Sequence, residues 1–158
     1  MQISNAEERL DGGTAYGSAA GPGSAQLARV LVAEDDPDIR AVIELALARV
    51  GGLDVVACAD GAVALALATR DPPDLILLDV MMPVMDGVET LARLKAEPAT
   101  ANIPVVFLTA RVQPRDLERY YAKGALAVIA KPFDPMTLAK QLRQLHAKED
   151  QKYEPDCS

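Results

Sequence analysis

Five short apolar runs alternate with segments of helical periodicity between positions 28 and 147 of this 158-residue chain. A short apolar run bounded by turn residues is typical of a buried strand, whereas apolar residues spaced three and four apart indicate an amphipathic helix. Strands that alternate with helices in this way lie parallel, with helices on both faces of the sheet. The pattern therefore predicts one α/β domain over residues 28–147. The predicted strands are Val30–Ala33, Leu53–Cys58, Asp74–Leu78, Pro104–Leu108 and Leu126–Ala130.

Each predicted helix follows a residue that is typical of helix starts. Asp36 is the expected N-cap of the first helix, because Pro37 then takes the first helical position. Gly51-Gly52 is expected to end that helix. Asp60 is expected to cap a second helix, which runs to about Thr69, and Asp86 is expected to cap a third, over Gly87–Ala96. The other helices are predicted over Pro114–Lys123 and from Asp134-Pro135 to about Ala147.

The two ends of the chain differ from this middle part. Residues 1–25 are rich in Gly, Ser and Ala, which predicts a flexible N-terminal arm. Residues 148–158 are predicted to form a polar C-terminal tail. Only eleven residues follow Ala147, so no output domain is expected after the α/β domain.

Composition narrows the classes of partner and location. The net charge is −7 and no basic cluster offsets it, which argues against a nucleic-acid surface. No apolar run approaches the roughly 20 residues of a membrane span, and the N-terminus lacks the features of a secretory signal. The two cysteines, Cys58 and Cys157, are too few for a disulfide scaffold. A cytoplasmic protein without nucleic-acid or membrane partners is predicted.

Chemically distinctive side chains follow four of the predicted strands. Glu34 and Asp35 follow the first strand, Asp79 the third, Thr109 the fourth and Lys131 the fifth. Each of these residue types is common on its own at a turn or a helix start. Four strand ends that all carry such residues together indicate a functional site. A doubly wound, flavodoxin-like (βα)5 sandwich with strand order 2-1-3-4-5 is favoured, because it places the first and third strands side by side at the switch point where ligands bind.

Three converging carboxylates repel one another unless a cation or a proton intervenes. Their oxygens are hard ligands that suit Mg²⁺ or Mn²⁺. A carboxylate beside such an ion can attack phosphorus and form an aspartyl phosphate. The metal, the Lys131 ammonium and the Thr109 hydroxyl are then available to neutralise the oxygens of the transferring phosphoryl group.

Four segments together resemble the receiver domain of two-component response regulators, over residues 28–147. They are Leu31–Asp36, Leu77–Gly87, Leu108–Ala110 and Ala130–Phe133. The resemblance implies that Asp79 accepts a phosphoryl group from a histidine kinase or a phosphotransfer protein.

The resemblance also implies roles for the residues around Asp79. Glu34 and Asp35 match the acidic pair that holds Mg²⁺, and Met81 matches the position whose main-chain carbonyl completes the protein ligands. Thr109 and Lys131 match the hydroxyl and the amine that contact the phosphoryl group. The Lys131–Pro132 bond matches one that is usually cis in the family.

Val128 departs from the family pattern, because receivers commonly carry Tyr or Phe three residues before the Lys. Val is short and stiff at χ1, so the response to phosphorylation is predicted to run through the Thr109–Pro114 loop instead. The prediction is a phosphorylation-controlled switch with an unknown downstream protein, not a turnover enzyme. Whether it is a stand-alone regulator, a relay intermediate or part of a larger protein stays open.

Three other functions are known for folds of this kind, and each differs from a receiver in what its site needs. A phosphate-independent interaction module with a receiver-like fold is the alternative, because Val128 weakens the usual switch. A phosphatase of the haloacid dehalogenase type needs Asp-x-Asp at its nucleophile, whereas Met81 takes the second acid's position. A flavodoxin-like nucleotide binder needs a Gly-, Ser- or Thr-rich phosphate loop after the first strand, and the sequence has acids there.

Overall fold

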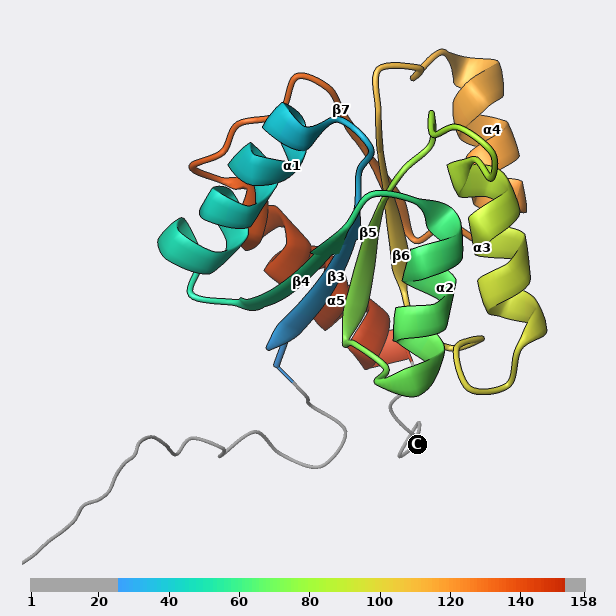
Figure 1. Cartoon of the computed structure of the whole chain (residues 1–158), viewed down its shortest axis with the longest axis horizontal. Coiled ribbons are helices and arrows are strands. Elements are labelled where there is room, and N and C mark those ends of the chain that lie inside the picture. The colour runs from blue at the N-terminus through green and yellow to red at the C-terminus, as the bar shows by residue number, and fades with distance from the viewer. Residues whose placement is uncertain (1–25, 153–158) are drawn as a thin grey trace, which may run out of the picture.

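Five parallel strands form a single sheet in the computed structural model, which describes residues 26–152 (Figure 1). The strands lie in the order β4-β3-β5-β6-β7, which is the order 2-1-3-4-5 along the chain. The predicted flavodoxin-like topology is therefore confirmed. The strands are β3 (Arg29–Ala33), β4 (Asp54–Cys58), β5 (Leu75–Asp79), β6 (Val105–Thr109) and β7 (Ala127–Ala130).

The helices cover both faces of the sheet. Helices α1, η1 and α5 pack on one face, and α2, α3 and α4 pack on the other (Figure 1). The central strands β5 and β6 are buried along their whole length, as expected for strands covered on both faces. The helices are α1 (Pro37–Glu44), which η1 (Leu45–Val50) continues as a π-helix, α2 (Gly61–Arg70), α3 (Gly87–Ala96), α4 (Pro114–Ala122) and α5 (Leu138–Lys152).

Aspartate side chains cap three of the helices at the predicted positions. Asp36 accepts hydrogen bonds from the N–H groups of Asp38 and Ile39 at the start of α1. Asp60 and Asp86 accept in the same way from the first turns of α2 and α3. Each cap satisfies main-chain donors that have no partner inside the helix, so these residues fix where the helices begin.

The structure differs from the prediction at the two ends of the last helix. Residues 135–137 form a turn, in which the Met136 N–H donates to Asp134 Oδ1, and α5 begins only at Leu138. The helix then continues to Lys152, five residues beyond the predicted end at about Ala147.

Two further predictions concern the N- and C-terminal ends of the chain and possible membrane-spanning helices. The predicted arm, residues 1–25, and residues 153–158 of the predicted tail lie outside the described residues. None of the helices within residues 26–152 has the length and apolar character needed to cross a membrane.

Candidate functional site

The candidate site lies at the carboxyl edge of the sheet, where β3 and β5 are neighbours. Parallel pairing places Ala33 beside Leu78, so Glu34 and Asp79, the residues that follow them, come to the same edge. Thr109 ends β6 and pairs with Ala130, the residue before Lys131. The sheet therefore brings together four strand ends whose side chains are far apart in the sequence.

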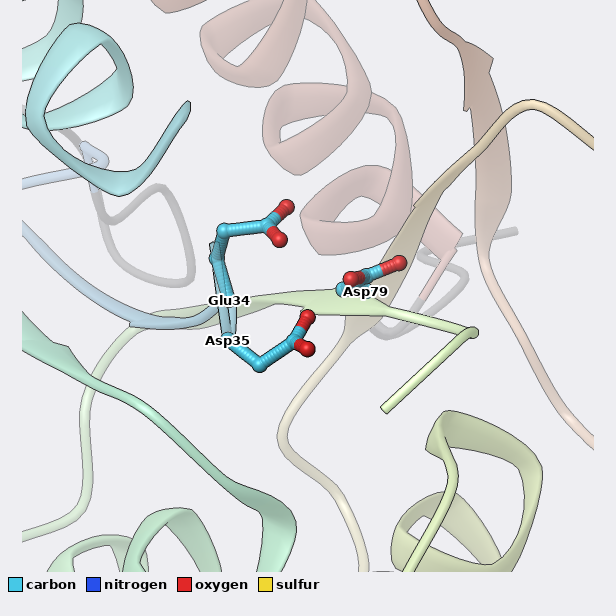
Figure 2. Close-up of side chains that lie close together, drawn as sticks. All are labelled: Glu34, Asp35 and Asp79. Carbon is cyan, nitrogen blue, oxygen red and sulfur yellow. The ribbon is translucent and has the colours of Figure 1, made fainter. Parts of the chain in front are cut away.

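Three carboxylates converge at this edge. Glu34, Asp35 and Asp79 each offer one oxygen, and these oxygens all lie within 4.8 Å of one another. Figure 2 shows the three side chains turned toward a common space. Glu34 and Asp79 are only 1% and 3% exposed, whereas Asp35 is exposed. This donor set fits a hard divalent cation that keeps some of its water on the exposed side.

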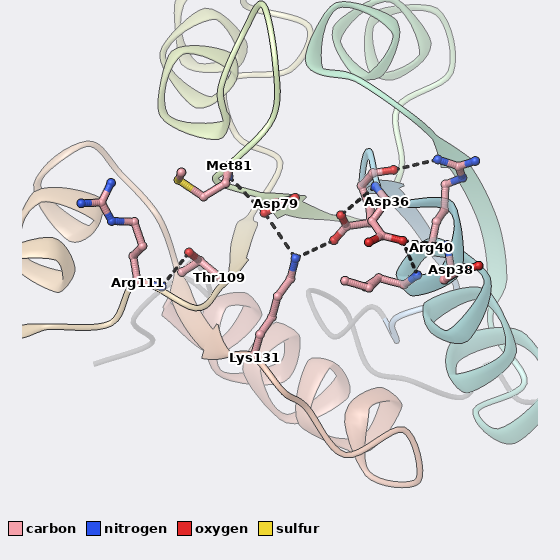
Figure 3. A network of polar contacts seen from close by, with 10 residues as sticks. Asp36, Asp38, Arg40, Asp79, Met81, Thr109, Arg111 and Lys131 are labelled. Carbon is pink, nitrogen blue, oxygen red and sulfur yellow. Dashed lines mark hydrogen bonds and ion pairs between the residues drawn. The ribbon is translucent and has the colours of Figure 1, made fainter.

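Lys131 supplies a positive charge to the carboxylate cluster. Its Nζ lies 3.6 Å from Asp79 Oδ1 (Figure 3). The same Nζ lies 2.9 Å from Glu34 Oε1. Burial lowers the pKa of Lys131, but its hydrogen bond to Glu34 and the charge of Asp79 outweigh burial and raise that pKa above its ordinary value. One ammonium against three carboxylates leaves the site with an excess of negative charge.

The pKa of the Asp79 carboxyl group is strongly raised, first by burial and then by its acidic neighbour. Burial, followed by the proximity of Glu34, raises the pKa of Asp79 from 3.8 to about 7, although the Met81 N–H and Lys131 act in the opposite direction. Without a further cation, a proton thus competes for Asp79 near neutral pH. A divalent ion at the cluster favours the ionised carboxylate, which is the form able to act as a nucleophile.

Two further predicted residues lie beside the acids. The main-chain N–H of Met81 donates to Asp79 Oδ1 at 3.1 Å, while the Met81 side chain is exposed. The role predicted for the Met81 carbonyl stays a prediction. Thr109 is fully buried, and its Oγ1 accepts a hydrogen bond from the Arg111 N–H at 3.0 Å (Figure 3). The Lys131–Pro132 bond is cis, as predicted.

Contacts that position Glu34 were not predicted from the sequence. The N–H of Asp36 donates to Glu34 Oε2 at 3.1 Å, and Arg40 Nη1 donates to the Glu34 carbonyl at 2.9 Å. Together with Lys131, they hold the buried Glu34 on both its main chain and its side chain. The Arg40 contact reaches back from α1 to the end of β3, and no pattern in the sequence distinguishes it from a surface arginine.

The loop between β5 and α3 approaches the acceptor strand closely. A Cβ on Gly87 would lie 2.4 Å from the Asp79 carbonyl oxygen and 2.7 Å from the Val80 Cα, so only glycine fits there. Val84, in the middle of the loop, has φ of 68°, which is a strained conformation for a β-branched residue. Gly87 thus allows the start of α3 to approach the end of β5 closely, where its N–H donates to the Val80 carbonyl at 2.9 Å.

Replacing Asp79 with Asn is expected to stabilise the metal-free protein at pH 8. The raised pKa means that the native state binds a proton more tightly than the unfolded state, so stability falls as pH rises from 3.8 to about 7. Removing this buried charge is expected to gain on the order of 2 kcal/mol, or about 4–8 °C in melting temperature. Thermal unfolding with chelator should show a clearly smaller gain at pH 5. Asp35→Asn, at an exposed position, is the control and should gain less; equal gains would contradict the account of burial.

Comparisons with known proteins agree with this arrangement. Residues 30–143 match the response regulator receiver domain family. The chain is 38% identical over 122 residues to the DNA-binding dual master transcriptional regulator RpaA of Synechocystis sp., covering 77% of this chain and 50% of RpaA. It is 42% identical over 120 residues to the response regulator PleD of Caulobacter vibrioides, covering 75% of this chain and 26% of PleD.

One solved structure is similar to this protein in both fold and sequence. The chemotaxis response regulator CheY4 of Vibrio cholerae has a TM-score of 0.70 and 34% identity, with 75% of this chain and 98% of that chain covered. By contrast, the matches to RpaA and PleD span half or less of those two proteins. The topology, the acidic edge and the extent of the match all agree, and the chain belongs to the receiver domain family of two-component response regulators.

Proposed function

We propose that this protein is a phosphorylation-controlled switch in a two-component or phosphorelay pathway, with Asp79 as the phosphoryl acceptor. The observation that carries the proposal is the position of Asp79, a buried carboxylate at a strand end, with two further carboxylates within 4.8 Å and the Lys131 ammonium at 3.6 Å. The raised pKa of Asp79 supports the proposal, because carboxyl groups with strongly perturbed pKa values are frequent at functional sites.

The proposed reaction moves a phosphoryl group from a histidine nitrogen of a kinase or phosphotransfer protein to Asp79. An Asp79 oxygen forms the new bond to phosphorus as the phosphorus–nitrogen bond breaks, and the imidazole keeps the electron pair of that bond. Lys131 Nζ, already beside Asp79, would contact one phosphoryl oxygen, and the Thr109 hydroxyl would donate to another. Each chain accepts one group per cycle, which is a switch and not enzymatic turnover.

Mg²⁺ is the proposed cofactor, with Mn²⁺ able to use the same oxygen ligands. Glu34, Asp35, Asp79 and the main-chain carbonyl of Met81 are the proposed protein ligands, of which the three carboxylates form the cluster. When bound, the ion would neutralise charge on the transferring group. The exposed side of the cluster, at Asp35, leaves room for water ligands.

An apolar hollow beside the site is the proposed docking surface for the phosphodonor protein. It has a volume of about 470 Å³ and lies between α1 and the segment after β7. Lys131 forms part of its lining, so a protein seated there would lie next to the acids. The apolar residues of the lining are Ile39, Val42, Ala110, Pro132, Phe133 and Pro135.

A phosphoryl analogue tests whether the protein is a switch. Beryllofluoride with Mg²⁺ is expected to shift the amide NMR signals of residues 109–120 most, and that of Val128 little, because Val128 is packed against the core. The same additions to Asp79→Asn should shift none of these signals. Large shifts centred on β7 with a static 109–114 loop would contradict the proposed route. A wild-type spectrum that does not respond would favour the alternative, a phosphate-independent interaction module.

A further inference from the structure

The main chain of Arg111 is held from two sides. Its N–H donates to Thr109 Oγ1 at 3.0 Å, and its carbonyl oxygen accepts a hydrogen bond from the Tyr120 hydroxyl at 3.1 Å. Thr109 ends β6 at the acidic site, and Tyr120 lies in α4. Through two hydrogen bonds, this one residue of the loop connects the site with the following helix.

Tyr120 is a fixed anchor for this connection. Its side chain is 1% exposed, and its ring packs edge-to-face on Phe107 of β6, with ring centroids 5.2 Å apart. Because both rings lie in the close-packed core, the hydroxyl has little freedom to follow a moving loop. The neighbouring Tyr121 is 50% exposed and differs in this respect.

The loop held by Tyr120 has space on its outer side. Residues 110–115 are exposed, and a hollow of about 280 Å³ lies among the residues of this loop and the first turn of α4. Packing therefore does little to restrain the loop. The Tyr120 hydroxyl is a specific contact that resists displacement of Arg111 from its present position.

A movement of Thr109 would act on the hydrogen bond between Arg111 and Tyr120, because Thr109 is itself bonded to Arg111. Within residues 26–152, its hydroxyl accepts from Arg111 but has no acceptor for its own hydrogen, which is thus available for a phosphoryl oxygen. If Thr109 moves toward Asp79, the bonded Arg111 N–H is drawn along, while the Tyr120 hydroxyl stays in the core. The Arg111–Tyr120 hydrogen bond is then lost.

We propose that Tyr120 is a positioning residue for Thr109: its hydroxyl holds the Arg111 peptide, and thereby the loop, in the unphosphorylated conformation. The inference rests on the proposed function, since it assigns a restraint to the same switch. The aromatic side chain that connects the site with the loop then lies on α4, at Tyr120. It does not lie at position 128 of β7, where Val128 has no hydroxyl.

Tyr120→Phe tests the inference, because it removes only the hydroxyl and keeps the ring against Phe107. Losing a hydrogen bond that favours the unphosphorylated loop is expected to tighten binding of beryllofluoride with Mg²⁺ about fivefold, which corresponds to about 1 kcal/mol. NMR titration of the loop amides measures this affinity. Tyr121→Phe is the matched control on the same helix and is expected to stay within about twofold of wild type.

The outcomes separate the inference from the proposed function. Tighter binding by Tyr120→Phe, with Tyr121→Phe unchanged, supports the inference, since a general loss of stability does not increase the affinity of the native state. Unchanged or weaker binding by Tyr120→Phe, while the wild type responds normally, overturns the inference and leaves the proposed function intact. A wild type that binds no beryllofluoride contradicts the proposed function, and the inference with it.

Discussion

When excess chelator removes divalent metal, the rate at which acetyl phosphate labels this protein is expected to fall at least about 100-fold. The physical reason is charge. Three carboxylates lie within 4.8 Å, a single ammonium faces them, and an incoming phosphate adds more charge of the same sign. Incorporation of phosphate, measured by intact-protein mass spectrometry, should recover on adding Mg²⁺. Full-rate labelling in the chelator would contradict a metal-dependent site.

Two neighbouring acids give a matched test of which residues hold the metal. Asp35→Ala removes a carboxylate of the cluster and is expected to weaken Mg²⁺ binding by about 10- to 100-fold. Asp36→Ala removes the cap of α1, so it is expected to cost about 1 kcal/mol of stability and little metal affinity. Calorimetric titration with Mg²⁺ and thermal unfolding distinguish the two effects. Equal losses of affinity would show that the cluster has been assigned to the wrong residues.

Lys131→Ala is expected to slow labelling by acetyl phosphate on the order of 100-fold, the usual effect of losing one donor to a transferring group. Lys131 is the only side-chain cation that the structure, over residues 26–152, places in an ion pair with Asp79. The variant should also bind Mg²⁺ more tightly, because the ammonium and the ion compete for Glu34. Lys123→Ala, at an exposed position after α4, is the control and should leave both properties unchanged. Weaker Mg²⁺ binding by Lys131→Ala would contradict this competition.

The sequence was sufficient to predict the fold and the convergence of the acids. Parallel βα units alone do not fix the strand order, but the acids that follow the first and third strands favoured the order that makes these strands neighbours. Once β3 and β5 are neighbours, Glu34 and Asp79 must reach the same edge. The helix starts at Asp36, Asp60 and Asp86 were also predictable, because a cap is a local interaction between residues close in sequence.

What the sequence did not predict depends on contacts between distant elements or on small differences in local energy. The π-helical last turn of the first helix, where the Gly51 N–H reaches the Ala46 carbonyl, accompanies the close packing of Gly51 against Ala139 of α5. The hydrogen bond from Tyr120 to Arg111 depends on how α4 packs on β6. Neither contact leaves a periodic or motif signal in the sequence.

The most direct test of the central claim is to locate the phosphoryl group. The protein is treated with acetyl phosphate and Mg²⁺, the acyl phosphate is trapped by borohydride reduction, and the modified residue is identified by peptide mass spectrometry. We expect the modification on Asp79 of the wild type, and none in Asp79→Asn. Modification of Glu34 or Asp35, or labelling that persists in Asp79→Asn, would contradict the assignment of Asp79 as the phosphoryl acceptor.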